Sequence, residues 1–297
     1  MTLLFYRGHN SELTSSLGPW SISPNTSRTP PGGWRSTAKR HWYLYVFEAL
    51  ELAAFMVAVC IFGVLFFHRG YVMSQVVPTP LYRRVLMGFA MGITVLVIVK
   101  SPLGKRSGAH INPAVTLAYL RLNLMTRPDA FFYITFQFLG GLLGVGLARM
   151  LLGPSLADPS VNYVVTVPGV YGILAAFLAE LLMAAGLMAM ILWVSNQPQI
   201  ARWTPYCVAA IVVIYAAFFS PLSGFSINPA RTTGSAVFAN LWTALWLYFV
   251  APVVGTLASA ELYMRGHGRE HILCAKLDPD PRYLCPFNCC YPSHKGA

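Results

Sequence analysis

The sequence is short of charged residues, and of acidic ones in particular. Only 10% of its 297 residues are charged, with 10 Asp and Glu against 21 Lys and Arg. Soluble domains carry about 25% charged residues, so this composition excludes an ordinary soluble protein. A basic excess can indicate nucleic-acid binding, but 56% of the residues are hydrophobic and the charges flank long apolar runs, so no nucleic-acid partner is expected.

A cleavable signal peptide and the motifs of an enzyme are also missing. Residues 1–40 are polar, and the first apolar run is internal. No nucleophile–base pair or cofactor motif is visible in the sequence. We therefore expect a protein that is not an enzyme and whose main activity needs no cofactor.

Long apolar runs dominate what is present. A membrane-spanning helix needs about 20 mostly apolar residues. Six runs are near or at that length, namely residues 50–67, 85–99, 130–152, 172–194, 206–219 and 241–263. The second and fifth are short, and we expect flanking residues to extend them. The sequence predicts an all-α, multi-pass protein in contact with lipid, placed in the cell membrane.

The basic residues lie mainly on one side of these runs. They concentrate in both terminal segments and in the connections between the second and third runs and the fourth and fifth runs, whereas residues 153–169 contain none. Lys and Arg favour the cytoplasmic side, which predicts that both termini are cytoplasmic. Arg69, Arg83 and Arg84 in the first outer loop are exceptions.

Composition divides the chain into three parts. Residues 1–40 are rich in Ser, Pro, Gly and Thr, which predicts a disordered cytoplasmic tail. Residues 41–265 form the membrane body, and residues 266–297 form a cytoplasmic tail with Cys and His.

The membrane body contains an internal repeat, with halves at about residues 41–160 and 161–265. Glu48 near the first span aligns with Glu180 in the fourth, and each half reads as two spans, an Asn-Pro segment and a third span. Because three spans per half is an odd number, the second half must insert upside down. Inverted repeats of this kind place the working site near the membrane midplane, between the halves.

Each half carries one copy of the phrase Ile-Asn-Pro-Ala. Asn is a good helix cap and Pro is favoured in the first helical turn, so each copy predicts a helix start. A polar helix start at membrane depth is tolerated where it lines a cavity, so two of them indicate a pore. The residues concerned are Asn112, Pro113, Ala114, Asn228, Pro229 and Ala230.

Two half-helices entering from opposite faces would bring their amino-terminal ends together. Each end carries a partial positive charge, which opposes cations and protons. The two Asn side chains can donate hydrogen bonds to one water or hydroxyl, which interrupts a chain of donors along the pore.

The segments Ser107–Thr116 and Ser223–Arg231 resemble the two signature loops of the major intrinsic protein family, the aquaporins and aquaglyceroporins. The resemblance covers about residues 41–265. It implies six transmembrane helices plus two re-entrant half-helices in an inverted repeat, an aquaporin-like fold. It also implies a homotetramer with one pore per subunit, and passive passage of water and small neutral solutes such as glycerol, with protons and ions excluded.

The resemblance also implies roles for single residues. Arg231 would be the fixed cation of an outer constriction, and its other walls would be Phe225, Ala216 and Met91. Glu48 and Glu180 would anchor the re-entrant loops, and Glu51 could replace Glu48.

The predicted constriction bears on the solute. Ala216 stands where water-selective members place His, and with Phe225 it resembles the glycerol-conducting arrangement, although Thr232 stands where those members usually carry Asp. We expect water plus small neutral solutes. A facilitator mainly for urea, ammonia, hydrogen peroxide or a metalloid acid is the alternative, as is a non-conducting structural protein. A secondary transporter would need more spans and more ionisable residues.

The carboxy-terminal tail holds four of the six cysteines. Thiolate and imidazole ligands suit zinc or another soft metal, although the spacing is not a paired Cys-x-x-Cys pattern. Lipidation, a redox-responsive gate and idle thiols are the alternatives. The candidate ligands are Cys274, Cys285, Cys289, Cys290 and His294.

Overall fold

The computed structural model describes residues 33–268, 271–280, 282–283 and 285–287. All regular elements in these parts are helices. Six of the described helices are long and apolar enough to cross a membrane: α1 (Trp34–Phe67), α3 (Pro80–Lys100), α6 (Arg127–Leu152), α8 (Gly172–Ser195), α9 (Thr204–Phe218) and α12 (Leu247–His267). The α9 helix continues directly from the short turn η2 (Ala201–Trp203).

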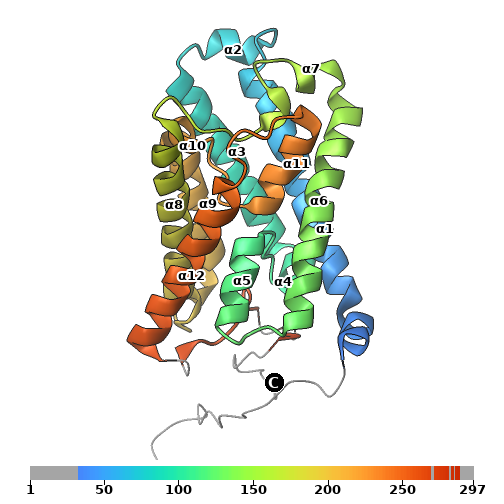
Figure 1. Ribbon diagram of the computed structural model, residues 1–297, viewed down its shortest axis with the longest axis vertical. Helices are drawn as coiled ribbons and strands as arrows, with labels where there is room; N and C mark the ends of the chain where they lie inside the picture. Colours follow the sequence, from blue (N-terminus) through green and yellow to red (C-terminus); the bar gives the residue numbers. More distant parts are fainter. Residues whose placement is uncertain (1–32, 269–270, 281, 284, 288–297) are drawn as a thin grey trace, which may run out of the picture.

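Two pairs of short helices enter the bundle from opposite ends (Figure 1). They are α4 (Pro102–Ser107) with α5 (Pro113–Arg121), and α10 (Ser220–Ser223) with α11 (Pro229–Ala239). In Figure 1 α5 lies in the lower half of the bundle and α11 lies in the upper half. We call the lower end, where α1 begins and α12 ends, the inner end. The remaining short elements belong to outer-end connections and are α2 (Val72–Val76), α7 (Pro154–Ala157) and η1 (Asn162–Val164).

The two short apolar runs are extended as the sequence predicts. The α3 helix starts at Pro80, and α9 has Pro205 in its first turn. Proline is favoured there because the first N–H groups of a helix have no intrahelical partner.

The first helix begins earlier than the sequence indicates. Residues 34–40, predicted as part of the disordered tail, are the first two turns of α1. Thr37 and His41 are buried, and His41 Nδ1 lies 2.8 Å from Asp129 Oδ1 at the start of α6. This contact stabilises the start of α1. The segment is rich in basic residues, so a criterion based on apolar runs does not include it in the helix. Residues 1–32 of the predicted tail lie outside the described residues.

Helices pack in corresponding pairs in the two halves. The α1 helix packs against α6, its counterpart α8 packs against α12, and α3 crosses α9 between them. Glycines allow the close approach: a Cβ atom at Gly140 would lie 2.3 Å from the Ala49 carbonyl oxygen, and one at Gly144 would lie 2.5 Å from that of Ala53. Small residues at such contacts are typical of helices that associate in membranes.

The outside of the bundle is apolar. Exposed large side chains recur at intervals of four residues, as Phe89, Ile93 and Val97 on α3 and as Leu139, Leu143 and Leu147 on α6. Side chains four apart share one helix face, so these stripes point away from the bundle toward lipid. The chain is a multi-pass integral membrane protein.

Residues 271–280, 282–283 and 285–287, which we call the carboxy-terminal strap, lie at the inner end of the bundle. The strap packs against the body there, and its buried residues include Ile272, Cys274, Ala275, Lys276 and Leu277.

Candidate functional site

The two Asn-Pro-Ala segments start α5 and α11 in the same way. Asn112 has an extended backbone, and its Oδ1 atom accepts a hydrogen bond from Ala114 N at 2.9 Å. Asn228 is also extended, and its Oδ1 atom accepts from Ala230 N at 3.1 Å and from Arg231 N at 3.2 Å. The oxygen of each amide thus caps its own half-helix, which turns the NH₂ group toward the opposite half.

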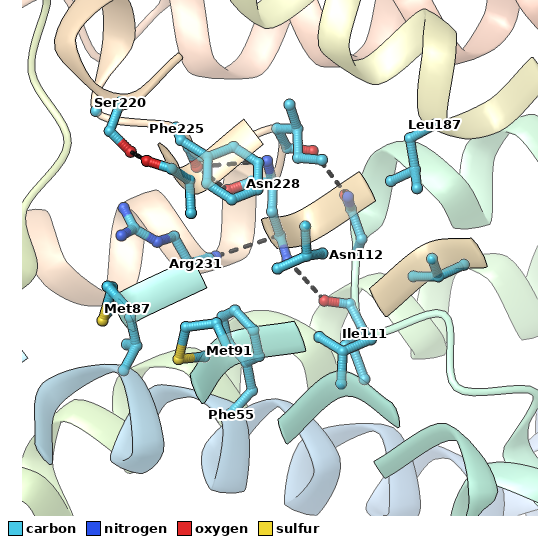
Figure 2. Close-up of a pocket in the computed structure, with 18 of the residues that line it drawn as sticks. Phe55, Met87, Met91, Ile111, Asn112, Leu187, Ser220, Phe225, Asn228 and Arg231 are labelled. Carbon is cyan, nitrogen blue, oxygen red and sulfur yellow. Dashed lines mark hydrogen bonds between the residues drawn. The ribbon is translucent and has the colours of Figure 1, made fainter. Parts of the chain in front are cut away.

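The two caps also bind each other's loops (Figure 2). Asn112 Nδ2 donates to the Ile227 carbonyl at 2.7 Å, and Asn228 Nδ2 donates to the Ile111 carbonyl at 2.8 Å. An amide nitrogen carries two hydrogens, so each Asn retains one donor beyond this reciprocal pair. Both Asn residues line the same cavity, and the amino-terminal ends of the half-helices therefore meet at one point of it.

The loops before the two caps have the same unusual backbone. Ala109 and Ile111 have φ angles of 53° and 43°, and Phe225 and Ile227 have 52° and 47°. Left-handed conformations at residues other than Gly cost about 1–3 kcal/mol each and persist only where the surroundings enforce them. They leave the Ile111 and Ile227 carbonyls free to accept the crossed Asn hydrogen bonds.

Glu48 and Glu180 enforce this backbone. Glu48 Oε1 and Oε2 accept from His110 N at 2.9 Å and Ile111 N at 2.7 Å. Glu180 accepts from Ser226 N at 2.9 Å and Ile227 N at 2.5 Å.

The sequence alternative for the first anchor, Glu51, binds elsewhere. Its carboxylate accepts from the Ser107 hydroxyl at 2.9 and 3.1 Å, one turn from Glu48 along α1. It supports the start of the loop rather than the inverted N–H groups.

A cavity of about 410 Å³ runs between the halves. Its lining includes few charged or polar side chains among mainly apolar ones, and no described carboxylate. The polar members are Arg84, His110, Asn112, Ser220, Ser226, Asn228 and Arg231.

All four predicted constriction residues line this cavity, namely Met91, Ala216, Phe225 and Arg231. Arg231 is only 6% exposed, and its Nη1 atom has no hydrogen-bond partner among the described residues. A buried guanidinium N–H without a protein partner is a donor for a molecule in the cavity.

The α3 helix contributes two methionines to this cavity. Met87 and Met91, one helical turn apart, both line it, and Figure 2 shows their side chains near Arg231. The predicted wall residue Met91 therefore has Met87 as a neighbour in the cavity, which the sequence reasoning did not name. The assignment of Met91 to the constriction stays a prediction.

Arg84 is another cavity residue that the sequence reasoning missed. It is half-buried, it lines the cavity, and its Nε atom donates to the Ala217 carbonyl at 3.0 Å. The sequence prediction treats Arg84, with its neighbour Arg83, only as a loop charge, although both lie in the first turns of α3.

The inner part of the cavity ends on Leu277 of the carboxy-terminal strap. Of the predicted metal ligands there, Cys274 and Cys285 lie together, with their sulfur atoms 3.7 Å apart. Cys289, Cys290 and His294 lie outside the described residues. Within the described residues no three His, Cys, Asp or Glu side chains gather as a metal site would require, so zinc binding stays a prediction.

The site has counterparts in known proteins. The chain is 29% identical to rat aquaporin-4 over 72% of its own length and 64% of the relative, and 33% identical to maize aquaporin NIP2-3 over 67% of its length and 63% of the relative. The matches thus span slightly less than two thirds of these relatives. The crystal structure of the aquaglyceroporin from Plasmodium falciparum has the same fold, with a TM-score of 0.62 at 21% identity, covering 75% of this chain and 95% of that one.

A family comparison covers the membrane body. The family model described as "Major intrinsic protein" matches residues 38–263, which include all six long helices except the first turn of α1 and the last turn of α12. That region is more than half of the chain, and it holds both half-helices and the loop anchors Glu48 and Glu180. The chain therefore belongs to the major intrinsic protein family.

Proposed function

We propose that this protein is a passive channel, rather than an enzyme, for water and small neutral solutes such as glycerol. One observation carries the proposal: both Asn caps and Arg231 line a single cavity, and no described carboxylate lines it. A cation in the cavity would therefore face the positive ends of two half-helices and a guanidinium. No described carboxylate is there to replace the water molecules of its hydration shell.

The crossed Asn caps support proton exclusion. A water molecule between Asn112 and Asn228 would accept from the remaining hydrogen of each amide. Its own hydrogens then point away from the caps, toward both ends of the pore, and the hydrogen-bond chain changes direction at this point. Proton hopping needs an unbroken donor order, so the file of water conducts molecules but not protons.

The composition of the constriction supports solutes larger than water. Ala216 leaves room beside Arg231, and Phe225 and Met91, with Met87 next to it, supply apolar walls. A polyol such as glycerol can place its hydroxyls on the Arg231 donors and its carbon chain on those walls. Urea, ammonia, hydrogen peroxide and metalloid acids are the competing neutral solutes. The Plasmodium structural neighbour is named as an aquaglyceroporin, which agrees with this choice.

The proposal includes orientation and assembly. We propose that both termini are cytoplasmic and that the α2 end of the bundle faces the outside of the cell, because most Lys and Arg flank the spans on the inner side. The apolar outer stripes of the bundle suit a homotetramer in which each subunit keeps its own pore.

Stopped-flow light scattering on reconstituted vesicles tests the function. Vesicles with the protein, under reducing conditions, should shrink and reswell faster than empty vesicles in glycerol, and should shrink faster in an impermeant osmolyte. A pH-sensitive dye inside them should report no added proton leak. Rates equal to those of bare lipid would favour a non-conducting structural protein, and a large proton current would rule out the proposed exclusion.

A further inference from the structure

The carboxy-terminal strap forms part of the inner wall of the cavity. Leu277 is 4% exposed, and it lines the same cavity as the two Asn caps. A molecule that leaves the pore on the inner side therefore passes Leu277. The position of the strap affects the width of this exit.

Backbone hydrogen bonds dock the strap directly onto the first re-entrant loop. Leu277 N donates to the Gly108 carbonyl at 3.1 Å, and His110 Nε2 lies 2.7 Å from the Ala275 carbonyl oxygen. The Phe287 ring stacks on the His110 ring at 6.1 Å between centroids. These contacts reach the loop two to four residues before Asn112.

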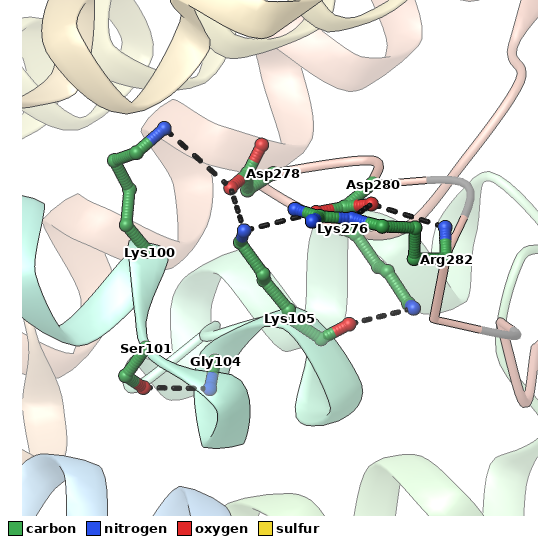
Figure 3. A network of polar contacts seen from close by, with 8 residues as sticks. All are labelled: Lys100, Ser101, Gly104, Lys105, Lys276, Asp278, Asp280 and Arg282. Atoms are coloured by element: carbon green, nitrogen blue, oxygen red, sulfur yellow. Dashed lines mark hydrogen bonds and ion pairs between the residues drawn. The ribbon is translucent and has the colours of Figure 1, made fainter.

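Charged side chains hold the strap from the side, as Figure 3 shows. Lys105 Nζ of α4 lies 2.9 Å from Asp280 Oδ2, and Lys276 Nζ donates to the Lys105 carbonyl at 2.7 Å. Hydrogen bonds from Arg282 and from Lys105 lower the pKa of Asp280, so the carboxylate stays ionised at neutral pH. All these contacts are non-covalent and leave the strap able to detach.

Two thiols bracket the part of the strap that covers the pore. The sulfur atoms of Cys274 and Cys285 are 3.7 Å apart, on either side of Leu277 in sequence. A disulfide needs about 2.05 Å between sulfurs, so the two sulfur atoms would have to approach by roughly 1.7 Å to bond. Cys274 is buried and Cys285 is half-buried, which makes Cys285 the thiol that an oxidant meets first.

We propose that Cys274 and Cys285 form a redox modification site, in which a disulfide made by a hydroperoxide locks the strap over the inner mouth of the pore. The proposal rests on the channel function proposed above. Reduced, the strap exchanges between docked and released positions. Oxidised, residues 274–285 form a closed ring, which lowers the conformational entropy of the released strap and so shifts the exchange toward the docked position.

The chemistry balances with one hydroperoxide and two thiols. The Cys285 thiolate attacks the peroxide oxygen, the O–O bond breaks, and hydrogen peroxide leaves one water and a sulfenic acid on Cys285. The Cys274 thiolate then attacks that sulfur, forming the S–S bond and releasing the second water. Two electrons pass from the thiols to the peroxide, and a cytoplasmic dithiol reverses the step.

Flux measurements on full-length protein in vesicles test the lock. Vesicles are treated with hydrogen peroxide or with dithiothreitol, washed, and assayed for glycerol and water flux. Oxidation should lower the wild-type rates by at least about threefold, because the strap would then be docked in most of the channel molecules. Dithiothreitol should restore the rates. The Cys285→Ser and Cys274→Ser variants should keep the reduced rate under both treatments, whereas Cys207→Ser, a half-buried thiol of α9 outside the cavity lining, should respond like the wild type.

Peptide mapping provides a second readout that does not depend on flux. Trypsin cuts after Lys276 and Arg282, so a disulfide would join the peptide that ends at Lys276 to the one that begins at Tyr283. Because the latter peptide also holds Cys289 and Cys290, the mapping uses a Cys289→Ser/Cys290→Ser chain as well as the wild type. We expect the linked pair in both oxidised chains and in neither reduced one.

Several results would overturn the lock while leaving the channel intact. One is an unchanged rate in oxidised vesicles that do contain the linked peptides. Another is a redox response that survives Cys274→Ser and Cys285→Ser. A third is stoichiometric zinc in purified protein that is lost in both variants, which would assign the thiols to metal. Absence of flux in reduced wild-type vesicles would instead reject the channel function itself.

Discussion

Glu48 and Glu180 each accept hydrogen bonds from two consecutive N–H groups of a re-entrant loop. Those N–H groups point away from the pore because alternate loop residues are in the left-handed region. The carboxylates satisfy donors that would otherwise be buried without partners, so they stabilise the strained loop in a membrane interior. The Asn amides line the pore, but the glutamates determine its backbone.

Replacing Glu180 with Gln should destabilise the second loop. The carboxylate of Glu180 accepts from Ser226 N and Ile227 N with its two oxygens, but a Gln amide has only one oxygen. The NH₂ group of the Gln would then face a backbone N–H donor. We expect a loss of about 1–3 kcal/mol in the free energy of unfolding, with lower flux, because one buried N–H loses its partner. Thermal unfolding of the purified protein in detergent measures this loss of stability.

The matched control is Glu261→Gln. Glu261 pairs with Arg121 and Arg265 at the surface, where such pairs contribute about 0–1 kcal/mol. Equal unfolding temperatures for the two variants would contradict the anchoring role of Glu180.

A second prediction at the residue scale concerns Ala216, which lines the cavity beside Arg231. An imidazole in place of the methyl group narrows the constriction and adds a polar wall. Ala216→His should lower glycerol flux about tenfold, the effect of about 1.4 kcal/mol on the barrier, while water flux changes much less. Stopped-flow light scattering compares the two.

Ala210→His serves as its control, because Ala210 is on the same helix but is exposed on the outside of the bundle. If glycerol flux is unchanged in Ala216→His, or falls equally in both variants, Ala216 is not part of the constriction.

The sequence predicted those site residues that short motifs identify, and it missed residues that no motif marks. Asn112 and Asn228 stand in near-identical phrases, and their capping bonds follow from the residue types. Arg84 and Met87 also line the cavity, but they stand in no motif, so only the packing of α3 against the other helices places them there. The assignment of Met91 to the constriction rests on spacing alone and stays a prediction.

At the scale of elements, the close packing of α1 against α6 depends on glycines of α6. Gly140 and Gly144 face α1, whereas a Cβ atom added to Gly146 would meet only the Phe238 ring among the described residues, at 3.3 Å. Two helix backbones in contact cannot move apart locally to admit a Cβ atom, whereas the Phe238 ring can rotate away from one. The three glycines are indistinguishable in the sequence, which predicted close packing without saying which residues make it.

Gly144→Ala should therefore separate α1 from α6. Its Cβ would lie 2.5 Å from the Ala53 carbonyl oxygen and 2.6 Å from Met56 Cβ. Overpacking of this kind costs about 1–3 kcal/mol, so the variant should unfold at lower temperature and elute more broadly in gel filtration. Gly146→Ala is the control and should behave like the wild type. The reverse order of stabilities would show that α6 does not approach α1 through Gly144.

At the scale of the whole molecule, the sequence predicted the six spans and their inverted halves, because both depend on apolar length and motif order alone. It predicted neither the strap nor the first two turns of α1. Both are polar or mixed segments, and they are ordered by contacts with residues far away in sequence, such as His41 with Asp129 and Leu277 with Gly108. Local composition carries no signal for such contacts.

The distribution of charge predicts the orientation of the whole chain. Val72 in α2 is 69% exposed at the outer end, and a Cβ atom added to Gly266 in α12, at the inner end, would meet no neighbouring described atom within 4 Å. In a chain whose cysteines outside the long helices are replaced by Ser, Val72→Cys should react with a membrane-impermeant maleimide on intact cells. Gly266→Cys should react only after permeabilisation, because Lys and Arg hold the inner end in the cytoplasm. Labelling of Gly266→Cys on intact cells, with Val72→Cys protected, would mean that the protein inserts the other way up and that the strap faces the outside.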